Sequence, residues 1–173
     1  MANSISEKLK GGDLRSIGKA NQVTEAVRTQ AEFDELFYAL HSDERIVTMR
    51  AADAIEKITQ SRPEFLTGHK KELLNFLGSE MNIELKWHLA LLMPRLSWEK
   101  TELAVVWSAL KTWAADKTES KIVRANSIQA LCELSERNVE HRQEFETILH
   151  KIGEENVPSL NARIRQFRKK AGT

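Results

Sequence analysis

The segment IVTMRAADAIEKI, residues 46–58, carries apolar or small residues at the spacing of one face of an α-helix. Counted from Val47 at offsets 0, 4, 7, 8 and 11, this face consists of Val47, Ala51, Ala54, Ile55 and Ile58. A buried face gains more from leucine than from alanine, yet alanine stands at two of these five positions. We therefore expect this helix to pack closely against more than one neighbour, where a larger side chain would not fit.

The same template recurs along the chain at a regular interval. It starts again at Leu85 and at Val123, and a weaker copy starts at Leu160, where Arg168 interrupts the apolar pattern. The starts lie 38, 38 and 37 residues apart. Each copy follows another apolar stripe of helical spacing, and these stripes lie within residues 33–40, 73–77, 103–113 and 145–152. A period in this range with two helices per unit is typical of an α-solenoid.

Three of these copies resemble the HEAT-repeat family: VTMRAADAIEKI (47–58), LKWHLALLMPRL (85–96) and VRANSIQALCEL (123–134). Val123 and Arg124 follow the valine–arginine pair that is usual in this family, whereas Thr48 departs from it. The resemblance implies an all-α fold, a right-handed α-α superhelix of about four HEAT-like helix pairs. The pairs are expected at about residues 31–61, 62–97, 98–138 and 139–171.

Residues 1–30 stand before the repeats. The apolar spacing of Ile17, Ala20, Val23 and Val27 predicts one amphipathic helix there, and Gly11-Gly12 marks a break before it. Since terminal repeats need a polar outer side, we expect this helix to cap the exposed apolar end of the first pair.

Composition narrows the classes of function. A chain of 173 residues with 41% hydrophobic residues fits one globular domain with a sizeable core. The net charge of +1 does not indicate nucleic acid or an anionic membrane as partner. The longest apolar run, residues 89–94, is too short to span a membrane. The single cysteine, Cys132, excludes an internal disulfide and favours a reducing, cytoplasmic location.

The sequence contains no pattern that specifies a reaction, a metal or a cofactor. The five histidines show no pairing at the spacing of metal ligands on a helix. There is no nucleophile elbow and no glycine-rich phosphate loop. His141 and Glu144 share one helical face, but one such pair does not define a site. We therefore predict no catalytic residue, no metal and no cofactor.

In HEAT-like stacks, the face opposite the buried template of the second helices lines the concave side. There Trp87, Met49 and Leu91 would form an apolar strip, and a tryptophan on an otherwise polar surface is a typical anchor for a partner. The residues predicted to form this binding surface are Met49, Arg50, Asp53, Trp87, His88, Leu91, Arg124, Gln129 and Arg163. The alternative is that the N-terminal segment or a neighbouring unit covers the strip.

Basic side chains beside the strip allow two interpretations. These side chains are Arg50, Lys86, His88, Arg124 and Arg163. In the first interpretation, they form a polar rim that selects a partner, which is either an acidic protein or a phosphate backbone. In the second, they bond to acidic loop residues such as Glu44, Glu80 and Glu119. The basic end of the chain, residues 161–170, is likewise either a phosphate-binding segment or a solvated helix C-terminus.

These observations favour a non-enzymatic scaffold or adaptor that binds another protein in its concave groove. One alternative is a HEAT-like DNA-binding protein or alkylpurine DNA glycosylase, for which Trp87, Asp53 and Arg50 are the candidate residues. The near-neutral net charge counts against this alternative. The other alternative is self-assembly through the apolar strip. We expect a monomer or a weak homodimer and no membrane partner.

Overall fold

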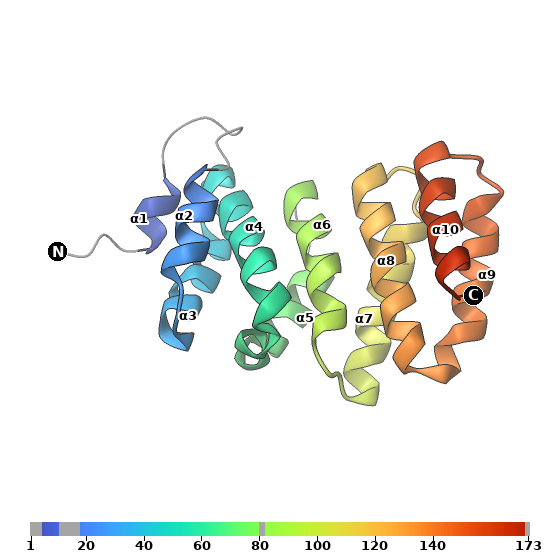
Figure 1. The fold of residues 1–173 in the computed structure, drawn as a ribbon, viewed down its shortest axis with the longest axis horizontal. Coiled ribbons are helices and arrows are strands. Elements are labelled where there is room, and N and C mark those ends of the chain that lie inside the picture. Colours follow the sequence, from blue (N-terminus) through green and yellow to red (C-terminus); the bar gives the residue numbers. More distant parts are fainter. Residues whose placement is uncertain (1–4, 11–17, 80–81, 172–173) are drawn as a thin grey trace. The chain divides into compact units, whose positions relative to one another are not determined.

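The structure, a computed structural model, describes residues 5–10, 18–79 and 82–171. All regular structure within these ranges is helical, with no strand (Figure 1). The α-helices are α1 (Ile5–Leu9), α2 (Gly18–Ala26), α3 (Gln30–Tyr38), α4 (Arg45–Ser61), α5 (Lys70–Gly78), α6 (Ile83–Leu92), α7 (Lys100–Ala115), α8 (Lys121–Arg137), α9 (Val139–Gly153) and α10 (Pro158–Ala171). Three short 3-10 helices are η1 (Ala39–His41), η2 (Pro63–His69) and η3 (Met93–Arg95). The all-α prediction is confirmed, and the handedness of the superhelix stays a prediction.

The chain divides into two compact units, residues 1–71 and 72–173, and each is described by itself. Four residues named in the sequence analysis lie outside the described ranges: Gly11, Gly12, Ile17 and Glu80. The predicted boundaries of the repeats stay a prediction.

Helix α4 is the centre of the first unit. It contacts α1, α2 and α3 as well as η1 and η2. Ala51 and Ala54 are completely buried on α4, as the small-residue pattern requires of a helix with neighbours on several sides. Helix α2 packs against α4 and buries Val23, and Val27 just after α2 is also completely buried. The amphipathic helix predicted before the repeats therefore covers apolar surface of the first unit.

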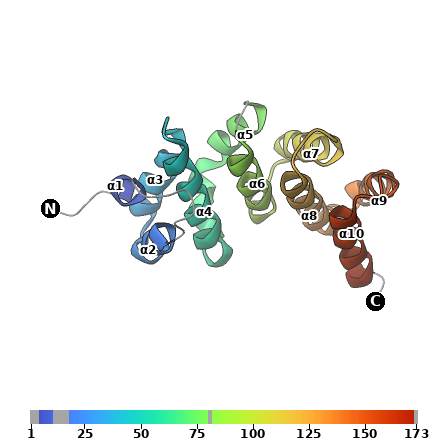
Figure 2. The same cartoon turned by 90° about the horizontal axis from the view of Figure 1, so that it is seen from above.

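The second unit has two layers of helices. Helices α7 and α9 form one layer, and α6, α8 and α10 form the other (Figure 2). Helix α8 contacts α6, α7, α9 and α10. Its buried face includes Ser127 and Ala130, which are both 0% exposed, together with Val123 and Leu131. The two small residues on this face allow α8 to approach its neighbours closely, which explains why leucine is absent from those two positions.

Polar side chains mark where the helices begin. Thr29 and Glu32 form a reciprocal capping box at the start of α3. The Asn82 side chain accepts a hydrogen bond from the Leu85 backbone N–H, at 2.8 Å, and Ser120 does the same for Val123 at 3.2 Å. These caps supply acceptors for backbone groups that have no partner inside the helix. They explain why α6 and α8 begin directly before their repeat templates.

Proline ends helix α6 rather than bending it. Pro94 belongs to the repeat copy at residues 85–96, but α6 stops at Leu92 and continues as the tighter turn η3. Proline has no backbone N–H, so it cannot continue the α-helical ladder. The Trp98 indole Nε1–H then donates to the Met93 carbonyl at 2.7 Å. A side chain from the following loop thus satisfies an acceptor at the helix end.

Replacing Ala130 by leucine tests the close packing of α8. Because the Ala130 side chain is completely buried, the added atoms should overpack the unit and lower the free energy of unfolding by about 1–3 kcal/mol. Urea denaturation followed by circular dichroism measures this change. Ala104→Leu, at an exposed position of α7, is the matched control and should change stability by less than about 0.5 kcal/mol. Equal effects of the two substitutions would contradict the packing argument.

Candidate functional site

Four of the predicted binding residues lie on the α6–α8–α10 layer of the second unit. Trp87 and Leu91 on α6, Gln129 on α8 and Arg163 on α10 are all half-buried. The Arg163 guanidinium Nη1 donates to the Gln129 side-chain oxygen at 3.5 Å, which joins α10 to α8. We call these four residues the Trp87 surface.

Trp87 is held at its backbone and is half-buried. The Asn126 side-chain amide on α8 donates to the Trp87 carbonyl at 3.1 Å. The indole meets the neighbouring His88 ring edge-on, with ring centroids 5.4 Å apart. The residue is half-buried and therefore is not sealed inside the core. A half-buried tryptophan with contacts of this kind is typical of anchors in protein interfaces.

Three residues predicted for the binding surface are buried instead. Arg50 is 1% exposed, Arg124 is 3% exposed and His88 is 8% exposed. The prediction that they line a polar rim is therefore wrong. Each stands next to the position of the template that was expected to be exposed: Arg124 stands one residue before it, and Arg50 and His88 stand one residue after it. In the fold, these side chains turn toward neighbouring parts of the chain. The two arginines show this directly.

Both buried arginines donate to backbone carbonyls at the ends of other helices. Arg124 Nε donates to the Ala114 carbonyl in the last turn of α7 at 2.9 Å. Arg50 Nη1 donates to the carbonyl of Leu9, the last residue of α1, at 2.7 Å. The last four carbonyls of a helix lack partners inside it, and a cation is favourable at that end. These side chains therefore hold the helices together.

The alternative interpretation, bonds to acidic loop residues, describes the basic side chains of the second unit better. Lys86 Nζ on α6 lies 2.5 Å from Glu119 in the α7–α8 loop, one of the partners named from the sequence. Arg124 Nη2 lies 2.9 and 2.8 Å from the two carboxylate oxygens of Glu155, which follows α9. In both cases, the residue directly after the first position of the template forms an ion pair with a glutamate of the following repeat. Arg163 differs because it bonds to Gln129, on the Trp87 surface.

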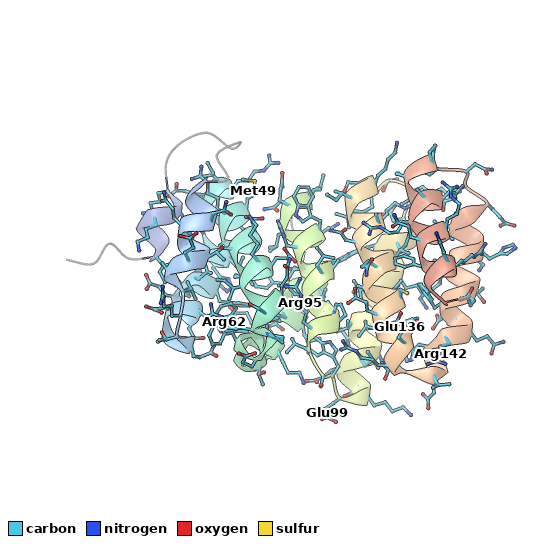
Figure 3. The ribbon with its side chains drawn as sticks, in the orientation of Figure 1. Met49, Arg62, Arg95, Glu99, Glu136 and Arg142 are labelled. Atoms are coloured by element: carbon cyan, nitrogen blue, oxygen red, sulfur yellow. The ribbon has the colours of Figure 1, made fainter. Side chains whose placement is uncertain are left out.

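The remaining predicted residues, Met49 and Asp53, belong to α4 in the first unit. Met49 is half-buried near the start of the helix (Figure 3). The Asp53 carboxylate lies 2.7 Å from Lys57 Nζ, one turn later on α4. Lys57 also donates to the Asn21 side chain on α2 at 3.0 Å. Asp53 is thus part of a half-exposed ion pair that links α4 to α2.

A second polar cluster joins α7 to α9 in the other layer. The Glu144 carboxylate on α9 accepts hydrogen bonds from Lys111 Nζ and from the Trp107 indole on α7, both at 2.8 Å. The hydrogen bond from Lys111, helped by that from Trp107 and opposed by burial, holds the pKa of Glu144 below its ordinary value. The sequence placed His141 and Glu144 on one face but did not connect them with α7. A spacing of about one repeat between Trp107 and Glu144 is the only signal for this contact.

The described residues contain no group of three or more histidine, cysteine, aspartate or glutamate side chains that would hold a metal ion. In the same part of the chain, no helix is long and apolar enough to cross a membrane. Cys132 is half-buried on α8, with its sulfur 3.9 Å from a Glu136 carboxylate oxygen.

The second helices of the pairs share a template with small residues, and side-chain bonds join successive repeats. This arrangement defines a helical-repeat protein. Comparison with known families agrees: the sequence model of the HEAT repeat domain matches residues 1–171. The chain belongs to this family. No curated protein and no solved structure matches the chain significantly.

Substitution of Arg124 separates a structural role from a role in binding. Arg124→Ala leaves the largely buried Glu155 carboxylate and the Ala114 carbonyl without their donor. We expect it to lower the free energy of unfolding by about 3–5 kcal/mol, measured by urea denaturation. The control is Arg165→Ala on the exposed side of α10, which should change stability by less than about 0.5 kcal/mol. A loss no larger than that of the control would show that Arg124 does not stabilise the fold.

Proposed function

We propose that this chain is a non-enzymatic scaffold that binds another protein through the Trp87 surface. The observation that carries the proposal is that Trp87 is half-exposed on the α6–α8–α10 layer. On the same layer, Lys86 and Arg124 are paired with glutamates of the chain itself. Large aromatic side chains with a fixed position dominate the binding energy of protein interfaces. Helical-repeat proteins use such surfaces because stacked helices keep them rigid.

The polar part of the surface supports the same proposal. Gln129 accepts from Arg163 and donates to Glu133 on its own helix. These polar side chains therefore have partners before another protein arrives, which lowers the entropic cost of binding. Leu91, one turn after Trp87 on α6, adds apolar area. Met49 is a separate candidate contact on α4 of the first unit.

The DNA-glycosylase alternative has weaker support. It needs Arg50 at a phosphate, but this guanidinium is buried and donates to the Leu9 carbonyl. It also needs Asp53 as a catalytic carboxylate, and Asp53 is paired with Lys57 at the surface. Exposed basic residues remain at the end of α10, namely Arg165, Arg168 and Lys169. A gel-shift titration at about 50 mM salt tests this alternative, since phosphate contacts are strongest at low salt; a retarded DNA complex would support it.

A cytoplasmic location and a monomeric or weakly dimeric state stay predictions from the sequence. Self-association through the Trp87 surface is separable from partner binding by light scattering at two concentrations. A molecular mass that rises with concentration in the wild type, and not in Trp87→Ala, would assign the surface to a homodimer.

Trp87→Ala tests the proposal directly. Affinity capture from a native lysate, quantified by mass spectrometry, should recover a defined partner with the wild type. Loss of an anchor of about 2 kcal/mol weakens binding about 30-fold, so recovery with Trp87→Ala should fall to background. Tyr38→Ala is the matched control, because Tyr38 is an aromatic side chain of the first unit that is 77% exposed and lies outside the Trp87 surface.

The thermal unfolding midpoint of Trp87→Ala is measured alongside the capture. A midpoint within a few degrees of the wild type, together with lost recovery, supports a role in binding. Unchanged recovery, or a variant that no longer unfolds cooperatively, would show instead that Trp87 does not act as a docking anchor.

A further inference from the structure

The second unit carries a groove on the layer opposite the Trp87 surface. It runs between the last turns of α7 and the C-terminal half of α9, which lie side by side in the same layer (Figure 2). Its volume is about 590 Å³. Its apolar lining residues are Ala115, Ile148 and Ile152, and we call these three residues the floor of the groove. Lys111, Lys117 and Lys151 stand around this floor.

The two acidic residues of the groove are neutralised by other side chains of the unit. Glu144 lies 2.8 Å from Lys111 Nζ, and its lowered pKa keeps it ionised and paired at neutral pH. Glu155 is paired with Arg124, which is itself buried behind the groove. The side chains of Thr112 and Thr147 donate to backbone carbonyls one turn earlier in their own helices. Their hydroxyl protons are therefore already engaged.

Two positive charges remain. Lys117, just after α7, and Lys151, in the last turn of α9, are exposed. Within the described residues neither ammonium group has a hydrogen bond or an ion pair. The lining of the groove holds three lysines and two glutamates. Since both glutamates are paired, Lys117 and Lys151 are the two lining charges that have no partner within the described residues. These charges flank an apolar floor, so one ligand can meet both features together.

We propose that this groove binds an acidic protein segment that inserts an aliphatic side chain onto the Ala115–Ile148–Ile152 floor and places carboxylates at Lys117 and Lys151. The floor has no aromatic ring on which a nucleic-acid base would stack, and it has no arginine fork for phosphate. An aliphatic floor between lysines instead matches a segment in which leucine-like and acidic residues alternate on one face. This site is a second surface, and it is independent of the partner proposed for Trp87.

The probe for the test is a synthetic helical peptide of about 14 residues, with leucine at positions i and i+4 and glutamate around them, labelled with fluorescein. Fluorescence polarisation with the full chain should show saturable binding. Replacing glutamate by glutamine in the peptide tests the charge contribution, and replacing leucine by serine tests the apolar contribution. Both changes, and a rise in salt from about 50 to 300 mM, should weaken binding at least about fivefold.

The decisive variant is Lys117→Glu/Lys151→Glu, which should weaken peptide binding at least about tenfold because it replaces attraction by repulsion. The milder Lys117→Gln/Lys151→Gln variant should give an intermediate loss. The matched control is Lys100→Glu/Lys121→Glu, which has the same change in total charge at exposed lysines outside the groove. It should bind within about twofold of the wild type. Circular dichroism confirms that each variant is folded.

Several outcomes would overturn this inference. The first is absence of saturable binding at about 1 mM protein. The second is an equal loss of peptide affinity in the groove variant and the control variant. The third is a single-stranded oligonucleotide that displaces the peptide more strongly than unlabelled peptide does. Trp87→Ala should bind the peptide as the wild type does. If Trp87→Ala loses the peptide, the peptide occupies the other layer, and the groove is not its site. Failure of the Trp87 proposal alone leaves the result in the groove unchanged.

Discussion

Close approach of four helices to α8 is the constraint on which the second unit depends. The helix contacts α6, α7, α9 and α10, and it can do so because Ser127 and Ala130 are small and completely buried. Larger side chains would push the layers apart and open the packing that gives the unit its stability. Helix α4 follows the same principle in the first unit with Ala51 and Ala54. Both surfaces of the second unit are built on helices that this packing holds in place.

Helices leave carbonyl groups at their ends without internal partners, and this chain supplies arginine from elsewhere in the sequence. Arg50 reaches Leu9, Arg124 reaches Ala114, and Arg137 reaches the Pro94 carbonyl at 2.6 Å. Arg62 likewise donates to the Val27 carbonyl after α2, also at 2.6 Å. The positive charge on these arginines therefore stabilises helix ends. Lys117 and Lys151, in contrast, have no hydrogen bond or ion pair within the part of the chain that the structure describes.

The sequence predicts the fold well because the repeat template is local. Spacing within one helix and recurrence of about 38 residues identify α4, α6, α8 and α10, and the capping residues Asn82 and Ser120 mark where two of them begin. The candidate site was predicted only in part. Trp87 and Gln129 lie half-exposed as expected, but the helical template cannot show that Arg124 meets the end of α7. The α7–α9 groove escaped prediction because it is made by first helices of two repeats, which the template does not describe.

All four tryptophans of the chain, Trp87, Trp98, Trp107 and Trp113, lie in the second unit, and the single tyrosine, Tyr38, lies in the first. Indole emission therefore records the melting of residues 72–173 alone, while far-ultraviolet ellipticity records helix loss in both units. Coincident transitions in the two signals would mean that the units melt as one cooperative block, and separated transitions would mean two. Because the tryptophans lie in one unit only, their fluorescence reports on the unfolding of the second unit without an added label.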